Sequence, residues 1–172
     1  EAFMVRHATQ WLAVRDLVKK KKIGDVRAIQ VLFSYFNRDP KNVRNKADML
    51  ANLHSKDAVV VDARGAGRFT GEEAEPRPEM ASGHIPGSRN LPFGKLFNAD
   101  GTWKRGAELT GAFTDAGVDM NKPMITTCGS GMTAAVVLFG ARMTGKTDVA
   151  LYDGSWSEWG LDADTPKALG AA

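Results

Sequence analysis

The sequence has few residues that form cross-links or bind metals. Among its 172 residues there are one cysteine and three histidines. A single cysteine excludes an internal disulfide, and together with scattered histidines it provides no usual ligand spacing, so we expect no metal site. No cofactor is expected either. No apolar run approaches the roughly 20 residues of a membrane-spanning helix. We therefore expect no membrane segment. The single cysteine fits a reducing compartment, so we expect the cytoplasm as the location.

The first residues do not show the charged-then-apolar pattern of a signal peptide, and the sequence has no strong charge of one sign. It begins Glu-Ala-Phe-Met, without an initiator methionine, so we expect a cut or processed end and no export. The formal net charge is only +3, and the densest basic cluster is Lys19 to Lys22. An exposed helix end explains that cluster better than a nucleic-acid surface, so no nucleic-acid partner is expected.

Residues 1–48 differ in pattern from the rest of the chain. Apolar spacing predicts an amphipathic helix over residues 10–21, and alternation predicts a strand over residues 26–36. A polar, basic stretch then runs to about residue 48, where we expect a domain boundary. This helix-strand segment would expose aromatic side chains on its own, so we expect it either to pack on the following domain or to form a homodimer through its strand edge.

Residues 49–172 show alternating short strands and helices. The predicted strands cover residues 58–61, 124–127 and 149–152, and the predicted helices cover the apolar stripe at 109–116 and residues 132–143. Such alternation is typical of an α/β fold with a central parallel sheet flanked by helices. Motifs at the ends of these strands would lie where open parallel sheets bind ligands.

The only cysteine lies between a predicted strand and a predicted helix, where two interpretations compete. Gly129, Gly131 and Ala134 match a dinucleotide fingerprint of the form G-x-G-x-x-A, with Asp153 as the ribose ligand. Alternatively, Cys128 begins a tight loop whose backbone N–H groups and following helix stabilise an anion at sulfur. Spacing alone leaves both interpretations open.

Six phrases in order resemble the mercaptopyruvate-type sulfurtransferases. They are VVVDAR at 59–64, GRF at 67–69, EPR at 75–77, SGHIPGS at 82–88, CGSGMTA at 128–134 and YDGSWSEWG at 152–160. The match covers residues 50–165 and is similar to the second, catalytic half of a family that usually has two rhodanese domains. The resemblance implies a rhodanese-like catalytic domain over residues 49–172.

The resemblance also implies a mechanism and a set of site residues. Cys128 would be the nucleophile that takes sulfur from a small-molecule donor as a persulfide and passes it to cyanide or to a thiol acceptor such as thioredoxin. Arg68 and Arg77 would grip the donor's carboxylate and keto oxygen. Uncharged residues in the cysteine loop favour 3-mercaptopyruvate over thiosulfate as the donor. The remaining loop residues that would bind substrate are Gly129, Ser130, Gly131, Met132, which replaces the family's usual valine, and Thr133.

Other polar and aromatic residues in these phrases have structural interpretations of their own. We interpret Asp62 and Arg64 as an ion pair that ties a strand end to neighbouring loops, with a supporting rather than a catalytic role. His84 is expected to brace a turn through its ring nitrogens. Asp153, Trp156 and Trp159 are expected to pack beside the site.

Residues 1–48 resemble a different family, and two alternative functions remain open. The phrases EAFMVRHATQWLAVRDLV, IGDVRAIQVLFSYFNRDP and NVRNKAD look like a non-catalytic fragment of the oxidoreductases related to glucose-fructose oxidoreductase. One alternative is a phosphatase, which needs a loop-closing arginine where this chain has Ala134 and Ala135. The other is a catalytically weak or inactive rhodanese module fused to a dehydrogenase fragment.

Overall fold

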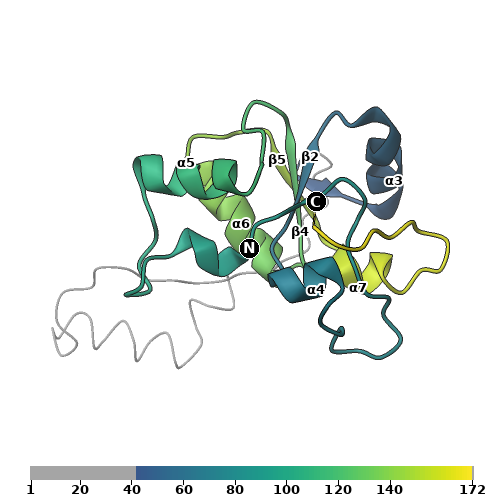
Figure 1. Ribbon diagram of the computed structural model, residues 1–172. Helices are drawn as coiled ribbons and strands as arrows, with labels where there is room; N and C mark the ends of the chain where they lie inside the picture. Colours follow the sequence, from purple (N-terminus) through teal and green to yellow (C-terminus); the bar gives the residue numbers. More distant parts are fainter. Residues whose placement is uncertain (1–41, 172) are drawn as a thin grey trace, which may run out of the picture. The chain divides into compact units, whose positions relative to one another are not determined.

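The computed structural model describes residues 42–171 (Figure 1). The helix predicted over residues 10–21, the strand predicted over residues 26–36 and the contacts expected of this segment lie outside the described residues. Within the described part of the chain, no helix is long and apolar enough to cross a membrane.

A parallel sheet forms the centre of the domain. Its five strands follow the order β1-β5-β4-β2-β3, and every neighbouring pair is parallel. The strands are β1 Val43–Arg44, β2 Val59–Asp62, β3 Arg89–Asn90, β4 Met124–Thr127 and β5 Val149–Tyr152. The α/β prediction is therefore confirmed, with the predicted bounds of β4 and β5 unchanged and β2 moved by one residue.

Helices fill the connections between the parallel strands. They are α3 Lys46–Ser55, α4 Ala66–Thr70, α5 Gly106–Asp115, α6 Met132–Met143 and α7 Ser155–Trp159, with a short 3-10 helix, η1, at Phe93–Leu96. A capping box begins α3, because the Asn45 side chain accepts from the Asp48 N–H and the Asp48 carboxylate accepts from the Asn45 N–H. The two helices predicted from apolar spacing correspond to α5 and α6.

The sheet is covered on both faces, which explains why nearly all residues of its central strands are buried. α5 and α6 lie on one side of the sheet, and α3 and α7 lie on the other (Figure 1). The first side buries Leu109, Phe113 and Val137 with other apolar residues, and the second buries Met49 and two tryptophans of α7. Burial of these side chains holds the carboxyl ends of the strands in fixed positions.

The start of the domain differs from the boundary predicted between residues 48 and 49. β1 pairs with β5 through Val43 and Leu151, and α3 runs through the predicted boundary. Lys46 Nζ also contacts Asp162 Oδ2 at 2.5 Å. Residues 43–48 are thus part of the same sheet and helical layer as the residues that follow them.

Candidate active site

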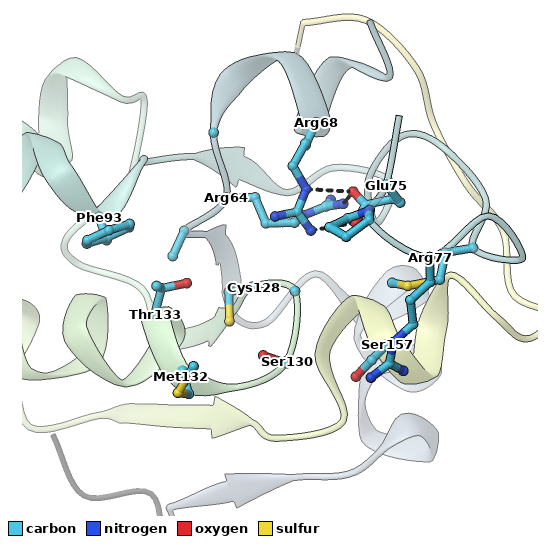
Figure 2. A pocket seen from close by; sticks show the side chains of 15 residues that line it. Arg64, Arg68, Glu75, Arg77, Phe93, Cys128, Ser130, Met132, Thr133 and Ser157 are labelled. Carbon is cyan, nitrogen blue, oxygen red and sulfur yellow. Dashed lines mark hydrogen bonds and ion pairs between the residues drawn. The ribbon is translucent and has the colours of Figure 1, made fainter. Parts of the chain in front are cut away.

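A pocket opens at the carboxyl ends of β2 and β4 (Figure 2). Its volume is about 330 Å3. Residues from the loops after both strands surround it, and many of them belong to the motifs found in the sequence. The lining residues are Ala63, Arg64, Gly65, Arg68, Glu75, Pro76, Arg77, Met80, Phe93, Cys128, Gly129, Ser130, Met132, Thr133 and Ser157.

Cys128 lies at the base of this pocket, in the loop between β4 and α6. The residue is only 2% exposed, and its thiol forms no disulfide. The Gly131 N–H donates to Cys128 Sγ over an N–S distance of 3.1 Å. The N-terminus of α6, a helix of 12 residues, follows directly after Gly131. A sulfur anion at Cys128 therefore meets a backbone donor and the positive end of a helix.

The cysteine loop keeps its shape because its outer carbonyls are held by α7. The Trp156 N–H donates to the Cys128 carbonyl at 2.8 Å, and the Ser157 N–H donates to the Gly129 carbonyl at 2.9 Å. Gly131 adopts a φ of +87°, a left-handed conformation that favours glycine. This curl turns the Gly131 N–H inward, as expected for a loop that binds an anion at sulfur.

Arg64 joins the end of β2 to two loops, as predicted for an ion pair. Its guanidinium donates to Asp62 through Nε and Nη2, and Nη2 also donates to the Gly83 carbonyl at 2.8 Å. Its Nη1 donates to Glu75 Oε1 at 2.7 Å. The guanidinium carbon lies 4.4 Å from the centre of the Trp156 ring. Asp62 itself does not line the pocket.

Arg68 projects from α4 over the cysteine loop and is paired with Glu75 (Figure 2). Arg68 Nε donates to Glu75 Oε1 at 3.2 Å, and Arg68 Nη2 donates to Glu75 Oε2 at 2.5 Å. A Cβ placed on Gly129 would lie 3.1 Å from Arg68 Nη2, so the guanidinium is close to the loop. The hydrogen bond to Glu75 raises the pKa of Arg68 above its ordinary value, despite partial burial, which lowers it.

Arg77 reaches the pocket from a different segment and has a different environment. It is exposed, and within residues 42–171 no carboxylate forms an ion pair with it. Met132 and Phe93 flank the pocket and are 55% and 43% exposed. The pocket therefore combines the cysteine loop and its inward-facing Gly131 N–H, a cation without an ion-pair partner among the described residues, and an apolar rim.

The remaining predicted residues lie around the pocket rather than in it. His84 Nδ1 donates to the Phe69 carbonyl at 2.9 Å, and its ring stacks on Phe69 with centroids 3.8 Å apart, an arrangement that fits a brace. Trp156 and Trp159 are buried in the core. Asp153 lies against Gly131, where a Cβ would meet Asp153 Oδ1 at 2.9 Å.

The family model of the rhodanese-like domain matches residues 45–162. The chain belongs to the rhodanese-like domain family. Its rhodanese-like domain is 46% identical over 131 residues to the 3-mercaptopyruvate sulfurtransferase of Rattus norvegicus, which covers 76% of this chain and 44% of that protein. It is also 44% identical over 122 residues to the thiosulfate sulfurtransferase of Cricetulus griseus, covering 70% of this chain and 41% of that protein.

The same likeness extends to solved structures. The rhodanese-like domain superposes on the crystal structure of a 3-mercaptopyruvate sulfotransferase from Escherichia coli with a TM-score of 0.59 and 42% identity, over 73% of this chain and 45% of that one. The chain spans less than half of the length of these relatives. The family match starts at residue 45, so the oxidoreductase likeness of residues 1–48 stays a prediction.

Membership in the rhodanese-like family favours the anion-loop interpretation of Cys128 over the dinucleotide fingerprint. The geometry agrees, because Asp153 packs on Gly131 instead of facing the pocket as a ribose ligand would. Within the part of the chain that the structure describes, no group of three or more His, Cys, Asp or Glu side chains is placed to hold a metal ion.

Sequence reasoning missed two polar residues at the site. Glu75 lies in the phrase that contains Arg77, and its buried carboxylate pairs with both Arg64 and Arg68. Ser155 lies in the phrase at 152–160, and its hydroxyl accepts a hydrogen bond from the Cys128 backbone N–H. The position of Glu75 two residues before Arg77 was a signal that could have indicated its role. The sequence held no comparable signal for Ser155.

Proposed function

We propose that this rhodanese-like domain is a sulfurtransferase that carries sulfur on Cys128 as a persulfide. The observation that supports it most is the placement of Cys128 Sγ at the base of a pocket, 3.1 Å from the Gly131 amide. The names of the relatives, 3-mercaptopyruvate and thiosulfate sulfurtransferase, support the same class of reaction.

In the first half-reaction the Cys128 thiolate attacks the sulfur atom of 3-mercaptopyruvate. An S–S bond forms, the C–S bond of the donor breaks, and its electron pair passes to the donor carbon as an enolate. The enolate takes up a proton and leaves as pyruvate. The second product is the Cys128 persulfide, whose terminal sulfur occupies the place of the donor's sulfur in the loop.

The two arginines of the pocket suit a donor that carries a carboxylate and a keto oxygen. A guanidinium binds such a group through paired donors, and charge develops on the keto oxygen as the C–S bond breaks. Gly129 and Ser130 put no cation in the loop, which supports 3-mercaptopyruvate as the preferred donor over thiosulfate.

In the second half-reaction an acceptor attacks the outer sulfur of the persulfide. A thiolate acceptor, such as a cysteine of thioredoxin, would become a persulfide, and cyanide would become thiocyanate. The Cys128 thiolate is restored in each case. We also propose a cytoplasmic location and a homodimer through residues 1–48, with neither a nucleic acid nor a membrane as partner.

Intact mass spectrometry tests the proposal directly. The protein and its Cys128→Ser variant are incubated with 3-mercaptopyruvate, and the sulfur is then released with a reductant. We expect a reversible gain of one sulfur atom in the protein and none in the variant. Without such a gain in the unmodified protein, the domain retains the fold but not the chemistry, and an inactive module becomes the better description.

A further inference from the structure

We propose that Glu75 is a positioning residue that aims the guanidinium of Arg68 at the donor's carboxylate. This inference rests on the proposed sulfurtransferase function and deepens it. The Glu75 side chain is 1% exposed, and its two oxygens receive hydrogen bonds from two different arginines. Figure 2 shows Glu75 beside both arginines at the pocket, with dashed lines marking these interactions.

The pattern of donors determines which edge of Arg68 remains free. Glu75 occupies the side edge of the guanidinium, formed by Nε and Nη2. The end edge, formed by Nη1 and the second hydrogen of Nη2, has no acceptor among the described residues. A guanidinium binds a carboxylate in a bidentate manner through either edge, so the free edge can take the donor's carboxylate while Glu75 holds the other.

The free edge lies on the cysteine side of the pocket. Arg68 Nη2 belongs to both edges and is 3.1 Å from the position of a Cβ on Gly129, the residue after the nucleophile. A carboxylate bound there would sit beside the loop that contains Cys128. Without the hydrogen bonds from its side edge to Glu75, the Arg68 side chain would rotate, because a long side chain in solvent populates several rotamers.

Arg64 makes Glu75 a rigid anchor. Asp62, Arg64, Glu75 and Arg68 form an alternating chain of charges that sum to zero, and only Arg68 is exposed, with 28% of its side chain accessible. Arg64 is itself held by Asp62 and by the Gly83 carbonyl. Glu75 therefore fixes Arg68, the partly exposed arginine of this ion-pair cluster, relative to the end of β2.

The Glu75→Gln variant distinguishes positioning from a general effect of charge. The variant makes the pocket more positive by one unit, so a role in charge alone would improve the binding of an anionic donor. If Glu75 aims Arg68, the donor is bound less well despite the added charge. The amide oxygen of glutamine can still accept from Arg64 Nη1, which keeps the buried donor satisfied.

The measurement is the rate of Cys128 persulfide formation against 3-mercaptopyruvate concentration in single-turnover experiments, followed by intact mass. In Glu75→Gln we expect the half-saturating concentration to rise about tenfold, the loss of one oriented charge-assisted contact, with the maximal rate changed less than about threefold. Glu72→Gln, an exposed change of the same charge in the same segment, is the matched control.

A double-mutant cycle with Arg68→Met measures whether the effect of Glu75→Gln depends on Arg68. When Arg68 is absent, Glu75→Gln should not raise the half-saturating concentration further. Neutral iodoacetamide should still alkylate Cys128 to completion in every variant, because the cysteine loop is intact, while the rate follows the charge that remains beside the thiol. A lowered or unchanged half-saturating concentration in Glu75→Gln, or equal effects with and without Arg68, overturns the positioning role. Absence of any persulfide in the unmodified protein overturns the sulfurtransferase function instead.

Discussion

The Oγ atom of Ser155 accepts a hydrogen bond from the backbone N–H of Cys128 at 3.2 Å. The same hydroxyl donates to the Tyr152 carbonyl at 2.9 Å, at the end of β5. Ser155 is fully buried and adopts a φ of +50°, which is uncommon for a residue other than glycine. One side chain thus ties the backbone of the nucleophile to a neighbouring strand, and the chain maintains a strained conformation there.

Two replacements of Ser155 distinguish the contribution of its hydroxyl to stability from the cost of its strained backbone. Ser155→Ala leaves a buried donor and a buried acceptor without partners, so we expect a loss of about 1–3 kcal/mol in the free energy of unfolding. Ser155→Gly loses the same hydroxyl but relieves the positive φ, which costs about 1–2 kcal/mol for a residue with a Cβ. Chemical denaturation should therefore rank glycine above alanine. The reverse order would show that the backbone there is not strained.

The two arginines of the pocket should respond differently to truncation. Arg77→Ala removes an exposed side chain without an ion-pair partner in the described structure, so the free energy of unfolding should change by less than about 0.5 kcal/mol. Arg68→Ala should lower it further, because the buried Glu75 loses one of its partners. Both variants should need at least about tenfold more 3-mercaptopyruvate for half-maximal persulfide formation. Equal stabilities would contradict the inequivalent environments.

Gly131→Ala should disrupt the cysteine loop. The new Cβ would lie 2.9 Å from Asp153 Oδ1 and 3.1 Å from the Asp153 carbonyl oxygen, at a φ of +87°. Because the Gly131 N–H is the one that contacts Cys128 Sγ, we expect persulfide formation to slow at least about tenfold, the effect of losing about 1.4 kcal/mol. Gly111→Ala in α5, where nothing lies within 4 Å, is the control and should keep the unmodified rate. A Gly131→Ala variant that is as fast as the unmodified protein would contradict the prediction and show that the loop keeps its conformation despite the added Cβ.

The ion pair between Lys46 and Asp162 should make thermal stability depend on pH. Its hydrogen bond lowers the pKa of Asp162 below the ordinary 3.8 and raises the pKa of Lys46 above the ordinary 10.5. A depressed carboxyl pKa contributes stability that is present above pH 3.8 and is lost as the pH falls through the folded pKa. A raised lysine pKa contributes stability that is present below pH 10.5 and is lost as the pH rises through the folded pKa.

The Asp162→Asn variant tests this window. The amide oxygen can still accept the hydrogen bond from the Asp164 N–H, so the variant mainly removes the charge. We expect the variant to have a lower Tm than the unmodified protein at neutral pH, and the difference to disappear in acid below the ordinary carboxyl range. A Tm difference that persists in acid would assign the effect to the turn and not to the ion pair.

The sequence predicted the core of the sheet well because short, largely apolar stretches alternate with helical patterns along residues 49–172, which is typical of buried parallel strands. β4, β5 and α6 have the bounds expected from their patterns. β1 and β3 contain two residues each, too few for a pattern, so only the folded sheet reveals them. Motifs located the Cys128 loop for the same reason that they identify the family: the loop's residues are contiguous in the chain.

Contacts between distant segments were harder to predict. Arg68 and Glu75 are seven residues apart, and Cys128 and Ser155 are 27 apart, and neither pair lies within one helix or strand that would place the partners together. The sequence therefore identified the arginine but not the carboxylate that holds it, and the cysteine but not the hydroxyl behind it. Both partners are oriented by loops whose course depends on the whole sheet.

The depth of Cys128 sets a condition on the shape of any molecule that takes its sulfur. The thiol lies at the base of a pocket and is almost inaccessible from outside, so a flat protein surface would stop at the rim formed by Phe93 and Met132. Cyanide or a small free thiol could enter, but a folded acceptor must present its cysteine on a narrow, protruding tip. Such a domain would select protein acceptors first by the shape of the surface around their cysteine and only then by the reactivity of that cysteine.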